Sequence, residues 1–217
     1  MIRFPKYLFW DALIGIKTGG GGPPPVAWQI NSFSATPNVI EAGTSQTVTL
    51  NWTMSSDPDS QSINQGIGAV AANLRTRVSG TISATTTFTL SASKDSNPYS
   101  ANTTVNFQRK RYWFTSASDL TPLTYGTLPV GFSQEFATSK ASIKVFDCTG
   151  GKYFYYMYPA SFGLATPQLI FNGFPVELDP ANIRLINFTN ESGDTAQYYL
   201  LRSDNILNSA GISIAFQ

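Results

Sequence analysis

The 217-residue sequence contains no histidine and one cysteine, and charged residues make up only 12% of it. Without histidine there is no imidazole general base, no Ser–His or Cys–His nucleophile pair and no His-containing zinc site. The single cysteine, Cys148, excludes a four-cysteine metal site and a disulfide within the chain. The balance of 14 Lys+Arg against 13 Asp+Glu gives no reason to expect a broad cationic surface for nucleic acid. The composition therefore predicts a protein that is not an enzyme, holds no cofactor or metal and does not bind nucleic acid directly.

Long apolar runs are also missing: none approaches the ~20 residues that cross a bilayer. Residues 7–16 are largely apolar and follow Arg3 and Lys6, as in a secretory leader. However, Asp11 interrupts them, and the glycines that follow do not form a cleavage site. We therefore expect neither a membrane span nor a cleaved leader.

The first eighteen residues are set apart by four glycines, Gly19–Gly22, and three prolines, Pro23–Pro25. Glycines give a flexible joint, and consecutive prolines favour a stiff polyproline II spacer. Residues 1–18 are too few to build a core, and left free they would be an exposed apolar patch. We predict an extended or short helical arm that anchors the chain on a neighbouring subunit, with residues 19–25 as its linker. Folding back onto its own domain is the alternative. The apolar side chains of the arm are Phe4, Tyr7, Leu8, Phe9, Trp10, Leu13, Ile14 and Ile16.

Residues 26–108 have the alternation of short β-strands. Every second residue of 48–54 is apolar, with Trp52 as the expected core aromatic, and the same alternation recurs in 88–92 and 103–107. Strands of this kind, separated by turn residues over about 80 residues, indicate an immunoglobulin-like sandwich. The turn residues are Ala42-Gly43-Thr44, Ser56-Asp57-Pro58-Asp59 and Asp95-Ser96-Asn97-Pro98.

Residues 109–217 open with the basic triplet Arg109-Lys110-Arg111 and continue as a second β-rich region. The triplet favours a solvated strand end at the junction between two domains, with a phosphate-binding patch as the alternative. The sequence therefore predicts an all-β protein of two tandem β-sandwich domains, 26–108 and 109–217, of which the first is Ig-like. The strands expected in the second region are Ser142–Asp147, Lys152–Tyr158, Gln168–Phe171, Ile183–Phe188, Ala196–Arg202 and Gly211–Phe216.

Paired carboxylates can perform acid–base chemistry without histidine. The pairs in this chain stand among Pro, Ser, Gly or Asn, where Asp typically forms turns, so we predict no catalytic residues. Cys148 has no base near it in the sequence, and we expect a plain small residue. The carboxylate pairs are Asp57/Asp59, Glu177/Asp179 and Glu191/Asp194.

An aromatic run at 153–158 places rings on both faces of a predicted strand, because alternate residues of a strand point in opposite directions. One interpretation is that one face fills a core and the other meets a partner or a sugar through Tyr153, Tyr155 or Tyr156. The other interpretation is a central strand buried on both faces.

Four sequence steps of the second region form a set: G-K-Y-F-Y-Y-M-Y-P-A-S-F-G at 151–163, F-N-G-F at 171–174, N-F-T-N-E-S-G at 187–193 and Y-Y-L-L-R-S at 198–203. Together they resemble a recurrent module of tailed-bacteriophage virion proteins. The preceding region resembles the Ig-like module commonly joined to it. Its matching residues are I-N-S-F at 30–33, E-A-G at 41–43, V-T-L-N-W at 48–52, F-T-L at 88–90, V-N-F at 105–107 and Y-W at 112–113.

The resemblance implies a structural protein of the virion, in a tail, neck or head-surface appendage, with no catalytic residues. Its partners would be other virion proteins and copies of itself. A surface adhesion or carbohydrate-binding module, with a host glycan on exposed aromatics, is the alternative function. A hydrolase that uses the carboxylate pairs is a third.

Overall fold

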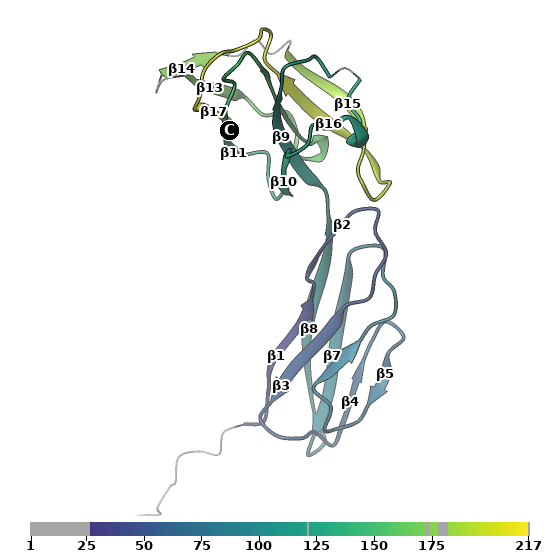
Figure 1. Cartoon of the computed structure of the whole chain (residues 1–217). Coiled ribbons are helices and arrows are strands. Elements are labelled where there is room, and N and C mark those ends of the chain that lie inside the picture. Colours follow the sequence, from purple (N-terminus) through teal and green to yellow (C-terminus); the bar gives the residue numbers. More distant parts are fainter. Residues whose placement is uncertain (1–26, 121, 172–173, 178–181, 217) are drawn as a thin grey trace, which may run out of the picture.

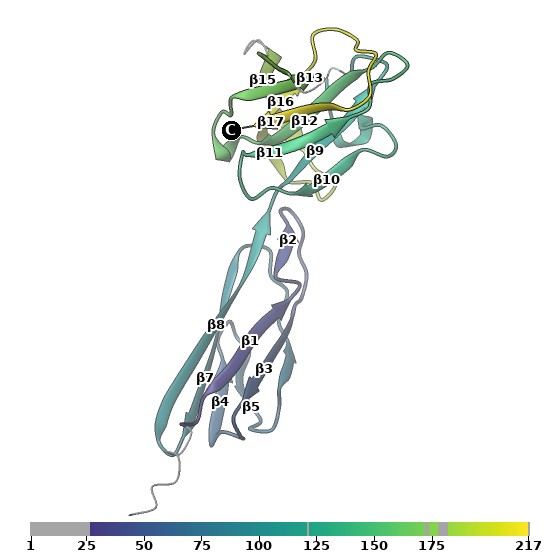
Figure 2. The ribbon, with the colours of Figure 1, turned by 90° about the vertical axis from the view of Figure 1, so that its left-hand side faces the viewer.

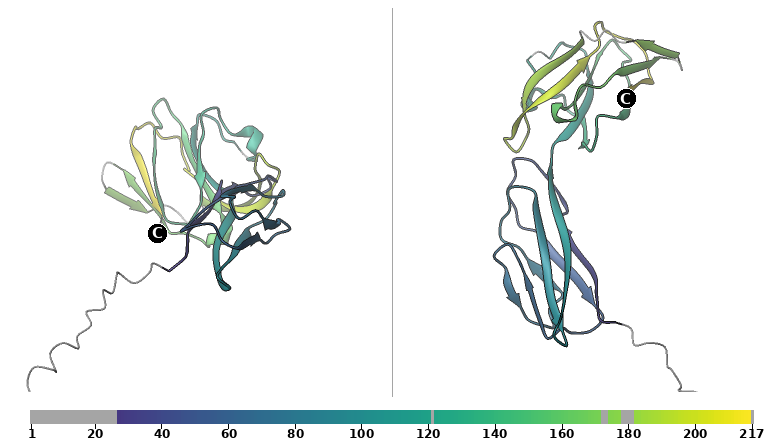
Figure 3. Two further views of the ribbon diagram at one scale, coloured as in Figure 1. Left: turned by 90° about the horizontal axis from the view of Figure 1, so that it is seen from below. Right: turned by 180° about the vertical axis from the view of Figure 1, so that it is seen from behind.

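The computed structural model describes residues 27–120, 122–171, 174–177 and 182–216, which form two β-sandwiches placed end to end (Figure 1). The predicted arm and linker, residues 1–25, lie outside the described residues. Figures 2 and 3 show the chain passing directly from the last strand of the first sandwich, β8 (Asn97–Gln108), to the first strand of the second, β9 (Lys110–Ser116).

The first sandwich pairs a three-stranded sheet, β1-β3-β6, with a five-stranded sheet, β2-β8-β7-β4-β5. β2 lies parallel to β8, and the other neighbours are antiparallel. β1, β3 and β6 thus form one sheet, and β4, β7 and β8 form the centre of the other. This division of strands between the two sheets is the immunoglobulin-like arrangement. The remaining strands are β1 (Ile30–Thr36), β2 (Val39–Glu41), β3 (Thr49–Met54), β4 (Ser60–Ile63), β5 (Gly68–Val70), β6 (Thr76–Val78) and β7 (Thr86–Lys94).

The core of the first sandwich lies between its sheets and follows the predicted alternation. Leu50 and Trp52 of β3 face Phe88 and Leu90 of β7, and all four are buried. The indole Nε1 of Trp52 donates a hydrogen bond of 3.0 Å to Gln61 Oε1, so its one polar atom is satisfied in the core. The prediction of Trp52 as the core aromatic is confirmed.

The second sandwich pairs a five-stranded sheet, β10-β9-β12-β16-β15, with a four-stranded sheet, β11-β17-β13-β14. Each predicted strand of this region occurs within one residue of its expected ends. The strands are β10 (Ser133–Phe136), β11 (Ser142–Phe146), β12 (Tyr153–Pro159), β13 (Pro167–Phe171), β14 (Phe174–Glu177), β15 (Ile183–Thr189), β16 (Thr195–Arg202) and β17 (Ile212–Phe216), with short 3₁₀ turns at η1 (Tyr125–Thr127) and η2 (Ala160–Phe162).

The central strand β12 is buried on both faces. Phe154 and Tyr156 pack between the two sheets with residues of β11 and β17. Tyr155 and Met157 point to the opposite face, where the connection between β9 and β10 covers them with apolar side chains such as Leu123. The aromatic run therefore belongs to two cores at once, because each face of the five-stranded sheet has its own cover.

Candidate functional site at the joint between the sandwiches

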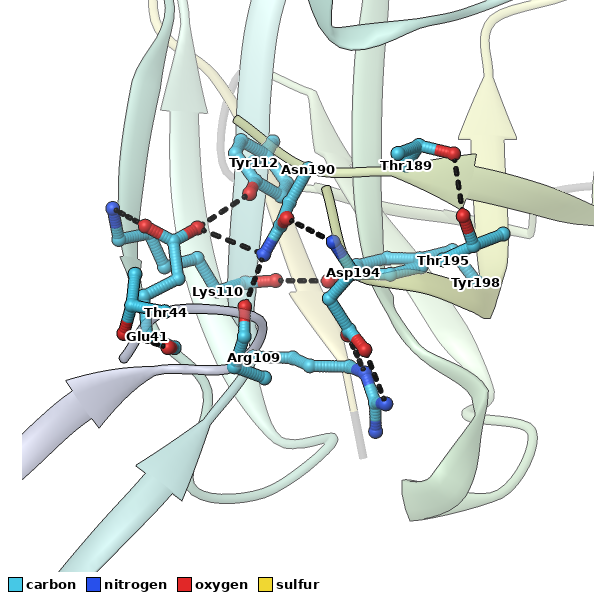
Figure 4. Close-up of polar contacts among 11 residues, drawn as sticks. Glu41, Thr44, Arg109, Lys110, Tyr112, Thr189, Asn190, Asp194, Thr195 and Tyr198 are labelled. Carbon is cyan, nitrogen blue, oxygen red and sulfur yellow. Dashed lines mark hydrogen bonds and ion pairs between the residues drawn. The ribbon is translucent and has the colours of Figure 1, made fainter. Parts of the chain in front are cut away.

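A single residue, Arg109, separates β8 from β9, so the strand that ends one sandwich begins the next almost without a break. The carbonyl of Arg109 accepts a hydrogen bond of 3.0 Å from the Ala137 N–H in the second sandwich. Such a short connection brings the turn after β2 against the turn between β15 and β16. These two turns and residues 109–112 form what we call the joint (Figure 4).

Glu41, the last residue of β2, is the centre of the joint. Its carboxylate lies 2.7 Å from the Lys110 ammonium and accepts hydrogen bonds from Asn190 Nδ2 at 3.2 Å and Tyr112 Oη at 3.5 Å (Figure 4). The side chains of Glu41 and Lys110 are 11% and 17% exposed. A shielded ion pair with further hydrogen bonds is costly to break, because removing one partner leaves a charge without compensation.

Asn190 links the two turns through both ends of its amide. Its Nδ2 donates 2.8 Å to the carbonyl of Ala42 in the first sandwich, and its Oδ1 accepts 2.9 Å from the Asp194 N–H in its own turn. Asp194 in turn receives a two-pronged contact from Arg109, with Nε–Oδ2 at 2.7 Å and Nη2–Oδ1 at 3.3 Å. Paired contacts of this kind fix orientation as well as distance.

Gly43 allows the two turns to approach each other. Its φ of +94° suits the third position of the turn that Thr44 closes by donating its N–H to the Glu41 carbonyl at 3.2 Å. A Cβ at this position would lie 2.8 Å from Asp194 Cβ and 2.9 Å from the Asp194 nitrogen. The glycine is therefore required twice, by the backbone conformation and by the opposing turn.

Buried tyrosines support the joint from the second sandwich. Burial raises the pKa of Tyr112, and the neighbouring Tyr198 and the negative charge of Glu41 add to the effect. Burial also raises the pKa of Tyr198, whose hydroxyl donates 3.1 Å to the carbonyl of Lys110. Both side chains consequently remain neutral hydrogen-bond donors across the physiological pH range.

The basic triplet lies at the junction as predicted, but the prediction of a solvated strand end is wrong. Lys110 pairs with Glu41 and Arg109 with Asp194. Arg111 is 4% exposed and donates to the carbonyls of Ser139 and Ala141. Lys110 and Arg111 are shielded, and Arg109, 37% exposed, is paired with Asp194, so the triplet makes contacts within the chain that favour neither a solvated end nor a phosphate patch.

Among the described residues, the carboxylates of the first and third pairs each have separate partners and do not assemble into a common site. Asp57 pairs with Arg75, and Asp59 accepts the Asp95 N–H and the Lys94 ammonium in a turn of the first sandwich. Glu191 accepts a hydrogen bond from the Tyr125 hydroxyl, whereas Asp194 belongs to the joint. The Glu177 side chain and Asp179 lie outside the described residues.

The expectation that Tyr155 and Tyr156 contact a partner or a glycan is wrong, because both are fully buried. Tyr153 is partly exposed, and the Arg202 guanidinium lies over its ring at 5.1 Å. The apolar side chains of the predicted arm, from Phe4 to Ile16, lie outside the described residues.

Cys148 is buried and free, and burial raises the pKa of its thiol, so it packs as a small residue. Within the described ranges, no group of three or more Cys, Asp or Glu side chains is arranged to hold a metal ion. Among the same residues, no helix is long and apolar enough to cross a membrane.

The sequence matches no family model and no curated protein. Among solved structures the chain is similar to the titin Ig tandem domains, at 9% identity and a TM-score of 0.23, over 88% of this chain and 96% of that one. It is also similar to the N-terminal eight Ig domains of Down Syndrome Cell Adhesion Molecule, at 8% identity and a TM-score of 0.27, over 83% of this chain and 23% of that one. TM-scores and identities this low carry no argument about function. The Ig-like class of the first sandwich rests on its own strand order.

Proposed function

We propose that this chain is a non-enzymatic structural component of a tailed-phage particle, in a tail, neck or head-surface appendage, and that residues 1–18 attach it there. The joint is the observation that carries the proposal. An ion pair, a bridging amide and a two-pronged arginine contact hold the two sandwiches in one relative orientation. A repeated component of an assembly needs such a fixed shape, because symmetric contacts form only when every copy presents the same surfaces.

The phage-like sequence motifs support the proposal by their position in the fold. E-A-G at 41–43 and N-F-T-N-E-S-G at 187–193 belong to different modules, yet they supply the two turns that meet at the joint. The G-K-Y…S-F-G motif at 151–163 forms β12 and η2 at the centre of the second sandwich. Motifs that form the joint and a core are expected in a module whose role is to hold a fixed shape in an assembly.

The test compares particles assembled with the full chain and with a chain that lacks residues 1–18. We expect the truncated protein to fold and to be missing from purified particles, as measured by mass spectrometry. A matched control replaces Lys6 and Lys17 of the arm by serine and leaves its apolar side chains in place; this variant should be incorporated normally. Normal incorporation of the truncated chain would contradict the anchoring role, and absence of the full chain from particles would contradict the function itself.

A further inference from the structure

A cavity of about 350 Å³ opens in the second sandwich at one end of its two sheets. Its walls combine apolar side chains of β9, β11 and the segment that leads into β10 with polar groups that include Asp147 and Lys152. The volume falls in the range of roughly 300–1,000 Å³ that is typical of ligand-holding pockets. The apolar lining residues are Trp113, Phe114, Pro129, Val130, Phe132, Val145 and Phe146.

Unpaired strand edges border this cavity. β10 pairs with β9 only from Lys110 to Trp113, so among the described residues 114–116 of β9 have a strand partner on the β12 side alone. β11 is the terminal strand of the other sheet and pairs only with β17. Free backbone N–H and C=O groups at such edges can take up an added extended segment.

Exposed apolar side chains lie at this cavity and along the neighbouring strand β11. Val130 is fully exposed, and Ile143 and Val145 of β11 are 68% and 62% exposed. Ile143 and Val145 are alternate residues of one edge strand and therefore lie on one face. An apolar edge strand beside a cavity invites pairing with another chain unless a partner covers it.

We propose that the apolar arm, residues 1–18, of a second copy of this chain occupies the cavity and pairs with the free edges. The proposal deepens the function above and rests on it, since it names the surface that receives the arm. The arm carries eight large apolar side chains within residues 4–16, which match the exposed apolar side chains of β11 and Val130, and its backbone groups can pair with the free edges.

The position of β1 favours a second copy over the same copy. β1 begins at Ile30, at the end of the first sandwich that is remote from the second (Figure 1). β8 runs the length of that sandwich with 12 residues, roughly 40 Å of extended strand. Residues 19–29, which lie between the arm and β1, span at most roughly 40 Å. A fully stretched tether of one copy would bring Thr18 only as far as the joint, so that copy could bring the outer part of its arm to its own cavity but not all eight apolar side chains.

The contact has a consequence for assembly. The arm at one end of a copy would engage the far sandwich of the next, a head-to-tail contact between different surfaces. Contacts of this type build rings when the rotation closes and filaments when it does not. Either outcome gives oligomers whose size depends on protein concentration.

The test uses the full chain in sedimentation velocity and a fluorescent peptide of residues 1–18 in binding titrations. We expect the chain to form concentration-dependent oligomers and the peptide to bind it and dissociate them. Val145→Lys should weaken both effects about tenfold or more, because an ammonium group cannot be buried unpaired in an apolar contact. The matched control is Val78→Lys on β6, where the side chain is 55% exposed in the other sandwich; it should change neither.

Three results would overturn the proposal: a chain that stays monomeric without peptide binding, oligomers that survive Val145→Lys when circular dichroism shows an intact fold, and equal loss with Val78→Lys. These results are distinguishable from failure of the proposed function. If the peptide does not bind the chain but the truncated chain is still lost from particles, the arm anchors on another virion protein and only the receiving surface is wrong.

Discussion

Replacing Gly43 by alanine tests the joint at its tightest point. Alanine in a left-handed conformation costs about 1–2 kcal/mol, and the new methyl group meets Asp194 at 2.8 Å, where overpacking costs about 1–3 kcal/mol more. Separation of the two turns relieves the second cost but breaks the hydrogen bonds of Asn190 to the Ala42 carbonyl and the Glu41 carboxylate, each worth about 1 kcal/mol. Opening of the joint therefore costs about as much as the overpacking that it relieves.

The matched control is Gly66→Ala. Gly66 has a φ of +76°, so its replacement carries a similar backbone cost, but a Cβ there meets nothing within 4 Å. The two variants share the strain and differ only in the contact across the joint. We expect both to lower the free energy of unfolding of the first sandwich by similar amounts.

The assay for the joint is the distance between dyes placed on the two sandwiches, measured by single-molecule energy transfer. Gly43→Ala should broaden and shift the distance distribution, whereas Gly66→Ala should leave it as in the unchanged protein. Equal distributions for Gly43→Ala and Gly66→Ala would refute the reasoning, because the two sandwiches would then be oriented by something other than the opposed turns.

Further predictions concern the ion pair, the first core and one tyrosine. In a double-mutant cycle, Glu41→Gln and Lys110→Met should show a coupling of about 0.5–3 kcal/mol in interdomain stability, and additive effects would mean that the pair contributes nothing. Phe88→Ala should cost the first sandwich about 3–5 kcal/mol in chemical denaturation, since the ring is fully buried; a loss below about 1 kcal/mol would contradict its place in the core. Burial, and then the hydrogen bond to Glu191, raises the pKa of Tyr125 to about 12. The folded pKa lies above the unfolded value of about 10, so this stabilisation is complete below pH ~10 and is lost as the pH rises toward 12. In an NMR titration Glu191→Gln should lower that pKa, and an unchanged value would contradict the role of the bond.

Strand alternation made the two sandwiches predictable. Inward-facing residues such as Leu50, Phe88 and Ile214 repeat with period two, and turn residues such as Gly43 and Gly193 separate the strands. Both kinds of signal lie within a few residues of one another in the sequence. They therefore indicate the strands without knowledge of the fold.

The joint was not predictable from the same signals. Glu41 and Asn190 are 149 residues apart, and each reads in the sequence as an ordinary turn or strand-end residue. Arg109 to Arg111 read as a solvated end because their partners come from other strands and loops. The burial of Tyr155 was missed for a related reason: its cover, which includes Leu123, comes from a connection without strand periodicity.

A reconstruction of purified particles by electron microscopy tests the proposed function most directly. The account predicts repeated copies of a two-lobed density into which both sandwiches fit with the joint closed, each connected through residues 1–18 to a neighbouring subunit. Particles that assemble fully, carry no such density and contain none of this chain by mass spectrometry would contradict it.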